Sequence, residues 1–223
     1  MTSPSKSELI MHKCTICQEQ GLDVVKNYPV LSFGDPREKT VLVVGINPSM
    51  AEYDGYLSKS KDPRVRHREQ LDYFDNNPYK FFERLGRFFE GDAQKALGWI
   101  DNPWEKVGFT DMVKCPTRKG KDQWSGLGRT MRRKIIDNCR KYLAHQLYEI
   151  SPSIIMTYGA DVCRWFYPAY KQENDAYTRR EFMINGKSRP LILVPQTQGS
   201  HTPGALIRFI QEEIAGIMRE TQT

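Results

Sequence analysis

The fold is decided by residues 41–49, which read VLVVGINPS. Four consecutive apolar residues without alternation are typical of a strand buried on both faces, as in a parallel sheet. The strand runs directly into a Gly-Ile-Asn-Pro turn, so Asn47 stands just beyond its carboxyl end. Ligand sites of open α/β folds form at the carboxyl ends of such strands. Asn47 is therefore the first candidate for a functional side chain.

Three further apolar runs have the same character, at 107–113, 154–158 and 191–194. Apolar residues with helical spacing separate or follow them, at 79–90, 131–150 and 203–218. Strands that alternate with helices indicate an α/β layer fold. The length of 223 residues fits one domain with a continuous core.

Other segments bear on organisation and location. No apolar run approaches the ~18 residues needed to cross a bilayer, and residues 1–10 lack the apolar region of a secretion signal. We therefore expect a cytoplasmic protein with a single domain, 1–223, in which residues 1–39 form an N-terminal segment. Residues 49–77 show no clear element and are interpreted as an inserted loop.

The charge distribution favours a polyanionic partner. The net charge is +6, and basic residues gather in runs at 64–68, 118–121 and 129–134. Such runs could hold phosphates, which makes DNA a candidate partner. The alternative is a set of solvated loops and helix faces, which explains any single run equally well.

The five cysteines suggest a metal site. Cys14 and Cys17 form a C-x-x-C hook, and Cys115, Cys139 and Cys163 follow far downstream. Such a hook binds zinc or iron, but a pair of cysteines also serves redox chemistry or arises by chance. Cys139 falls on the apolar stripe of 131–150, so it could equally be a small core residue. Cys163 is expected in the core.

Three segments then stand out in order along the chain: GINPS at 45–49, FTDMVKCP at 109–116 and NCRKYL at 138–143. The first resembles the G-I-N-P-G motif of the mismatch-specific branch of the uracil-DNA glycosylase superfamily. The second and third resemble the T-N-V-V-K-C-R-P stretch and the C-x-x-Y-L helix of its iron-sulfur branch. This resemblance implies a three-layer α/β/α sandwich around a short, mainly parallel four-stranded sheet.

The resemblance also implies a cofactor. In the iron-sulfur branch, cysteines at these places hold a [4Fe-4S] cluster, and the matching residues are Cys14, Cys17, Cys115 and Cys139. Thiolate spacing alone leaves zinc as the alternative. The interval from Cys115 to Cys139 is longer than in the branch, so loop details do not transfer.

Two candidate catalytic residues follow from the same resemblance. Asn47 corresponds to the asparagine that positions water, and as an amide it orients water without acting as a strong base; its alternative is a turn role with Pro48. His201, in GSHTPGAL at 199–206, resembles with one inserted residue the histidine that donates to the base carbonyl. Gln196 could occupy that place instead.

The resemblance also assigns base recognition to four residues, Phe74, Asp111, Ser49 and Gln196. Phe74 matches the base-stacking phenylalanine, although Tyr53, Tyr56 and Tyr73 are nearby rivals. Asp111 stands where uracil enzymes carry an asparagine, and a carboxylate would repel O4 of uracil but accept from the amine of cytosine. Its alternative is a structural carboxylate with uracil still the substrate. Ser49 is small where uracil-specific enzymes place a bulky tyrosine, so a 5-substituent could fit.

These inferences predict a monofunctional DNA glycosylase acting on a modified cytosine, for example a hydroxymethylated or glucosylated one in phage DNA, with a role in antiviral defence. The alternatives are a uracil or mismatch glycosylase in DNA repair and a non-catalytic DNA-binding module with iron-sulfur or zinc. No obligate protein partner is evident. Phosphate contacts are assigned to four basic residues: Arg118, Lys119, Lys121 and Arg208.

Overall fold

The computed structural model describes residues 6–25, 29–30, 32, 36–37, 39–48, 60, 62–76, 80–118, 123–172, 176–195 and 204–221. By its contacts the chain divides into two compact units. The first comprises Met1–Asp35, Gly45–Asn76 and Thr110–Glu149, and the second comprises Pro36–Val44, Asn77–Phe109 and Ile150–Thr223. Within the described ranges, no helix is both long enough and apolar enough to span a membrane.

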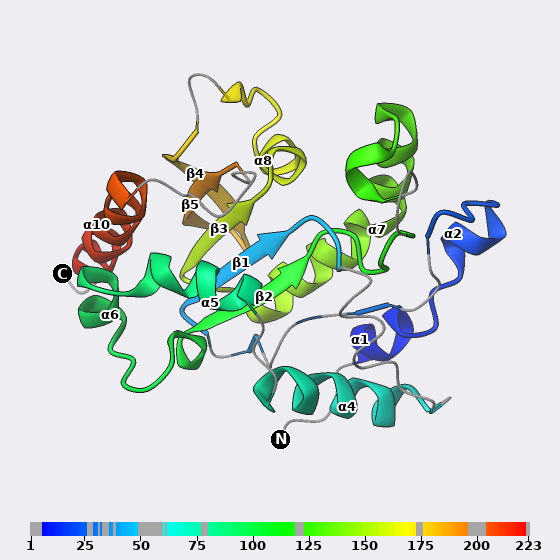
Figure 1. Ribbon diagram of the computed structural model, residues 1–223, viewed down its shortest axis with the longest axis horizontal. Helices are drawn as coiled ribbons and strands as arrows, with labels where there is room; N and C mark the ends of the chain where they lie inside the picture. The colour runs from blue at the N-terminus through cyan, green and yellow to red at the C-terminus, as the bar shows by residue number, and fades with distance from the viewer. Residues whose placement is uncertain are drawn as a thin grey trace. The chain divides into compact units, whose positions relative to one another are not determined.

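A five-stranded sheet forms the centre of the fold, in the order β2-β1-β3-β5-β4 (Figure 1). Its strands are β1 Val41–Gly45, β2 Val107–Asp111, β3 Ile154–Tyr158, β4 Thr178–Ile184 and β5 Lys187–Val194. β3 pairs in parallel with β1 and with β5, whereas β4 is antiparallel to β5. Every residue of β1 and β2 is buried, as continuous apolar runs predict. The α/β fold and all four expected strands are confirmed.

The expected strand count of four is wrong, because β4 adds a fifth strand at the edge of the sheet. Its sequence, TRREFMI, carries three charged residues and is only partly buried. The strand therefore has no apolar run from which it could be predicted. The signal lies in the turn that follows. Asn185 and Gly186 both have positive φ, 54° and 72°, as a two-residue type I′ hairpin requires. An Asn-Gly pair between two extended runs is a hairpin signature, and it identifies a strand that has no apolar run.

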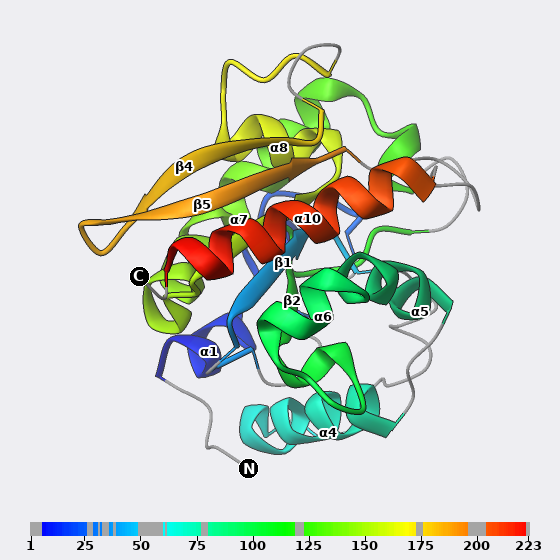
Figure 2. The same cartoon turned by 90° about the vertical axis from the view of Figure 1, so that its left-hand side faces the viewer.

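Helices of the second unit cover both faces of the part of the sheet formed by β3, β5 and β4. Figures 1 and 2 show α10 on one face and α8 on the other. α10 packs against α6 and η1, and α8 packs against β3 and β5. The elements are α5 Lys80–Gly86, η1 Arg87–Phe89, α6 Asp92–Leu97, η2 Pro103–Glu105, α8 Ala160–Phe166 and α10 Gly204–Glu220. The helix expected at 203–218 is therefore confirmed, while the one expected at 79–90 changes to a 3-10 turn after Gly86.

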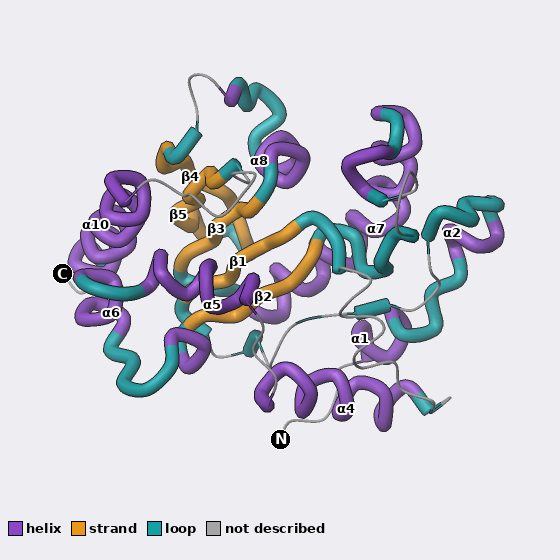
Figure 3. Tube along the Cα trace, in the orientation of Figure 1, coloured by secondary structure: helices purple, strands orange, loops and turns teal. Residues whose placement is uncertain are grey.

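Among the described residues of the first unit, the named elements are helices and the ends of β1 and β2. Its elements are α1 Lys6–Met11, α2 Ile16–Glu19, α4 Pro63–Asn76, η4 Trp124–Gly126 and α7 Arg129–Ile150. The predicted stripe of α7 is buried, including Ile135, Cys139 and Leu143. Part of the segment expected to form a loop, 49–77, is helical, because α4 occupies its second half (Figure 3).

α4 is held close to the chain that leads into the C-x-x-C hook. His67 on α4 and His12 are both buried, with 3.5 Å between His12 Nε2 and His67 Nδ1. Burial, together with the nearby positive charge of His67 and Arg66, lowers the pKa of His12 to about 3. Arg66 donates to the His12 carbonyl at 3.3 Å, and Gln70 donates to the Pro29 carbonyl at 3.1 Å. These contacts hold His12, two residues before Cys14, against α4, a helix that was not predicted from the sequence.

Candidate active site and cysteine cavity

The chain beyond β1 runs beside the chain beyond β2. The main-chain N–H of Met112 donates to the Gly45 carbonyl at 2.9 Å, and that of Val113 donates to the Ile46 carbonyl at 2.8 Å. These bonds extend the pairing of the two segments past the ends of the strands. The first motif and the segment that follows Asp111 are therefore neighbours in the first unit.

Asn47 is half-buried, and its side-chain nitrogen is engaged locally. Nδ2 donates to the Pro48 carbonyl at 3.0 Å and to the Thr117 hydroxyl at 3.4 Å. The first bond agrees with the turn role expected as the alternative. The amide oxygen Oδ1 is the atom through which Asn47 would accept a hydrogen bond from water. Thr117 was not foreseen as a partner, because it lies 70 residues away in the sequence.

Asp111 is the last residue of β2 and is 3% exposed. A carboxylate at this depth requires compensating interactions, since burial disfavours the charged form. Lys114 supplies a nearby positive charge, which interacts favourably with the Asp111 carboxylate. The ammonium of Lys114 also donates to the main-chain carbonyl of Asp111. The environment therefore accommodates a buried carboxylate at the end of β2.

Lys114 itself is 2% exposed, which is unusual for a lysine. Its Nζ donates to the Thr110 hydroxyl at 2.7 Å, and that hydroxyl donates to Gln146 Oε1 at 3.2 Å. Burial lowers the pKa of Lys114 to about 8, an effect that the negative charges of Asp111, Cys139 and Cys115 oppose. A lysine between the apolar Val113 and Cys115 is an indirect sequence signal, but its burial could not be foreseen.

All four cysteines of the expected metal site line one cavity of the first unit. The other lining residues are Met11, Pro29, Lys114, Asn138 and Tyr142. Thiol groups dominate the ligand chemistry of this cavity, and four thiolates suit an iron-sulfur cluster or zinc. The donor set therefore fits the expected cofactor. Among the described residues, no three His, Cys, Asp or Glu side chains are grouped as ligands of a single ion.

Two of the cavity thiols, Cys139 and Cys17, have raised pKa values. Burial raises the pKa of Cys139 to about 12, against the lowering effect of a hydrogen bond from the Lys114 main chain. Burial also raises the pKa of Cys17, although Asn138 donates to its Sγ at 3.5 Å. Metal binding requires thiolates, so loading this cavity must release protons. Asn138 is a further residue near the site that sequence reasoning missed.

Two of the remaining predicted site residues have described side chains, and they belong to different units. Arg118 is exposed in the first unit, and Arg208 is exposed on α10 of the second. Phe74 falls within α4, but its side chain is not described. Five others lie outside the described residues: Ser49, Lys119, Lys121, Gln196 and His201.

The fifth cysteine is a core residue, as expected. Cys163 is fully buried, and its Sγ lies 3.1 Å from the Thr157 hydroxyl. Burial raises the pKa of Cys163 to about 11. It does not line the cysteine cavity.

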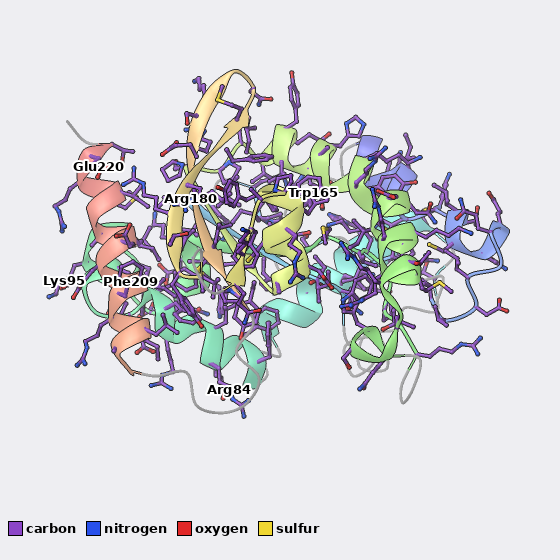
Figure 4. The ribbon with its side chains drawn as sticks, turned by 90° about the horizontal axis from the view of Figure 1, so that it is seen from above. Arg84, Lys95, Trp165, Arg180, Phe209 and Glu220 are labelled. Carbon is purple, nitrogen blue, oxygen red and sulfur yellow. The ribbon has the colours of Figure 1, made fainter. Side chains whose placement is uncertain are left out.

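Several half-buried cations and aromatic rings of the second unit are engaged in packing. Trp165 on α8 and Arg180 on β4 are labelled in Figure 4. The Trp165 ring packs on Phe166, with 4.8 Å between centroids, and Arg180 lies 5.4 Å from the centroid of Tyr167. Arg179 pairs with Glu220 near the end of α10 at 2.8 Å. These contacts explain the side chains structurally, without a ligand.

Comparison with known families decides which family these features represent. A model of the uracil DNA glycosylase superfamily matches residues 31–200, about three quarters of the chain. The chain belongs to the uracil DNA glycosylase superfamily. Members of this superfamily are DNA glycosylases, so membership supports an enzyme that excises bases with DNA as its substrate. The matched range contains Asn47, Asp111, Cys115 and Cys139. No curated protein matches the sequence.

Proposed function

We propose that this superfamily member is a monofunctional glycosylase that removes a modified cytosine from DNA and leaves an abasic site. The observation that carries the proposal is Asp111, a buried carboxylate at the end of β2. Because a carboxylate only accepts hydrogen bonds, it suits the exocyclic amine of cytosine and repels O4 of uracil. Ser49 at the end of the first motif supports room for a substituent on C5 of the base.

The reaction needs an extruded nucleotide, a stabilised leaving base and a positioned water. The bond between C1′ and the base nitrogen breaks, and both electrons leave with the base. A water molecule then adds its oxygen to C1′, and its proton neutralises the departed base. Asn47 orients this water through Oδ1, since Nδ2 is engaged with Pro48 and Thr117. An amide is a weak base, so most of the acceleration comes from stabilising the base anion.

Stabilisation of that anion is assigned to His201, and Gln196 is the alternative residue for this role. Stacking of the extruded base is assigned to Phe74. These roles rest on the resemblance of the second motif and on sequence order. Excision of ordinary cytosine would harm the host genome, which favours a modified base of foreign DNA and a role in antiviral defence. The basic residues Arg118, Lys119, Lys121 and Arg208 would contact phosphates.

The cofactor we propose is a [4Fe-4S] cluster on Cys14, Cys17, Cys115 and Cys139. The support is that these four thiols line one cavity, although they come from three distant parts of the sequence. The cluster would supply structural cross-linking, joining the N-terminal hook to the Cys115 segment and to α7. Zinc on the same thiols is the alternative, and broad visible absorption with bound iron and sulfide would distinguish the cluster from zinc.

The activity is tested on four otherwise identical DNAs that carry uracil, cytosine, 5-hydroxymethylcytosine or its glucosylated form at one position. Alkali reveals abasic sites after incubation. The proposal expects cutting at the modified cytosines, lost in Asn47→Ala and retained in Asn102→Ala. Asn102 is a fair control because its side chain caps the turn η2 in the second unit. Cutting without alkali would contradict the monofunctional assignment.

Two other functions would give different results in the same assay. A uracil or mismatch glycosylase of general repair is favoured by the superfamily itself, and it would cut at uracil and spare the modified cytosines. A non-catalytic DNA-binding module would retain DNA without cutting any of the four. The engagement of Asn47 Nδ2 in its own turn is the observation that favours this last candidate.

A further inference from the structure

Lys114 has no part in the proposed excision chemistry, yet it is the most deeply buried cation of the cysteine cavity. On one side its ammonium donates to the Thr110 hydroxyl and to the Asp111 carbonyl. Both of these acceptors are uncharged, and the Asp111 carboxylate supplies opposite charge on this side. Desolvating an ammonium is costly, and opposite charge with good geometry offsets that cost.

On its other side Lys114 lines the cavity of the four cysteines. Its main-chain N–H donates to the sulfur of Cys139, and its charge would interact favourably with Cys115 and Cys139 as thiolates. Four thiolates around a dipositive metal centre leave a net charge of about −2, whether the centre is zinc or an oxidised [4Fe-4S] core. Such a site needs nearby positive charge when it is removed from water.

We propose that Lys114 is a positioning residue of the cysteine site: its ammonium balances the charge of the four thiolates and ties the loaded site to the end of β2 at Thr110 and Asp111. This inference rests on the proposed metal centre. It explains why a lysine is buried beside cysteines, and it gives metal loading a direct route to the base-recognition carboxylate. Loss of metal would leave the ammonium with less opposing charge and loosen the end of β2.

The role of charge can be separated from that of hydrogen bonding. Lys114→Met removes both the charge and the donor, whereas Lys114→Gln removes the charge and keeps a donor. Lys134→Met is the matched control, because Lys134 also interacts electrostatically with a cavity cysteine, Cys17, but is exposed to solvent. Solvent screens the charge of Lys134, so its removal should matter little.

The full-length chain and the three variants are purified anaerobically, and the loss of bound metal to a chelator is followed. Circular dichroism and thermal unfolding check that each variant folds. We expect metal loss about 10- to 100-fold faster in Lys114→Met and Lys114→Gln, the range that partners of metal ligands usually show, with Lys134→Met like wild type. In iron-loaded protein, both Lys114 variants should also show a lower reduction potential, because a nearby positive charge favours the reduced cluster.

The contrary results fall into two kinds. If the wild type binds metal, and Lys114→Gln retains that metal and the reduction potential like wild type, this inference alone is overturned. Hydrogen bonding without charge would then suffice. A wild-type chain that holds neither iron nor zinc overturns both the inference and the proposed cofactor, while the excision assay remains a separate test of the glycosylase activity.

Discussion

Asp111 determines base preference in this account, because one oxygen in place of an amide nitrogen changes a donor into an acceptor. We predict that Asp111→Asn shifts preference toward uracil. A well-placed pair of hydrogen bonds to a base edge discriminates by about 1–3 kcal/mol, and the ratio of kcat/KM for uracil over modified cytosine should rise accordingly.

The matched control for that variant is Asp137→Asn, which changes an exposed carboxylate of α7 that pairs with Arg140. It should leave the ratio as in wild type. An unchanged ratio in Asp111→Asn would assign Asp111 a structural role beside Lys114 and remove the argument for cytosine.

Cys163 provides a second prediction for a single side chain. Because burial raises its pKa to about 11, the reactive thiolate is scarce at neutral pH. We predict that iodoacetamide leaves Cys163 unmodified in the native protein and labels it after denaturation, as mapped by mass spectrometry. Metal removal should not change this, since Cys163 is not among the residues that line the cavity. Rapid native labelling would show that the core around Thr157 opens readily.

Among the elements, the hairpin of β4 and β5 depends on a left-handed turn. Gly186 has φ +72°, and a side chain added there would meet nothing within 4 Å. Any cost of Gly186→Ala therefore comes from the backbone, and we predict a loss of about 1–2 kcal/mol in the free energy of unfolding. Urea denaturation measures it.

A glycine-to-alanine substitution in α10 should change the free energy of unfolding in the opposite direction. Gly216 lies inside the helix, where an added Cβ would meet only the end of Arg219, at 3.9 Å. Alanine is a better helix former, so Gly216→Ala should stabilise by up to about 1 kcal/mol. Equal effects at the two glycines would contradict the turn geometry.

The hairpin also shows why the sequence predicted some elements and missed others. β1, β3 and the end of β5 are continuous apolar runs, and burial on both faces makes such runs visible. β4 is an edge strand with charged residues, so the Asn-Gly turn after it is the sequence feature that indicates it. α4 was missed because its sequence, PRVRHREQLDYFDN, is polar on most faces and owes part of its burial to His12 and Pro29, which are distant in the sequence.

The candidate site was predictable to the extent that it follows motif order. The four cysteines were identified by resemblance, and the cavity brings them together. Lys114, Thr117 and Asn138 could not be found in this way, because their roles depend on partners far away in the chain or on burial. Composition does not reveal which lysine is desolvated.

For the molecule as a whole, the net charge of +6 predicts salt-sensitive DNA binding. The logarithm of the affinity should fall linearly with the logarithm of salt concentration. Arg118→Ala should weaken binding of all sequences alike and reduce that slope by about one. Arg140→Ala is the control, since Arg140 is exposed but lies on α7 near Asp137. Fluorescence anisotropy across a salt series measures the slopes, and an unchanged slope in Arg118→Ala would remove Arg118 from the DNA contact.

The activity proposed for this enzyme is hydrolysis of the glycosidic bond of a modified cytosine with the help of Asn47. It is tested by mass spectrometry of the free base released from DNA that contains uracil, cytosine and 5-hydroxymethylcytosine or its glucosylated form together. We expect release of the modified cytosine by the wild-type protein, little or none by Asn47→Ala, and a DNA strand that stays intact until alkali is added. Release of uracil alone, or of no base at all, would contradict it.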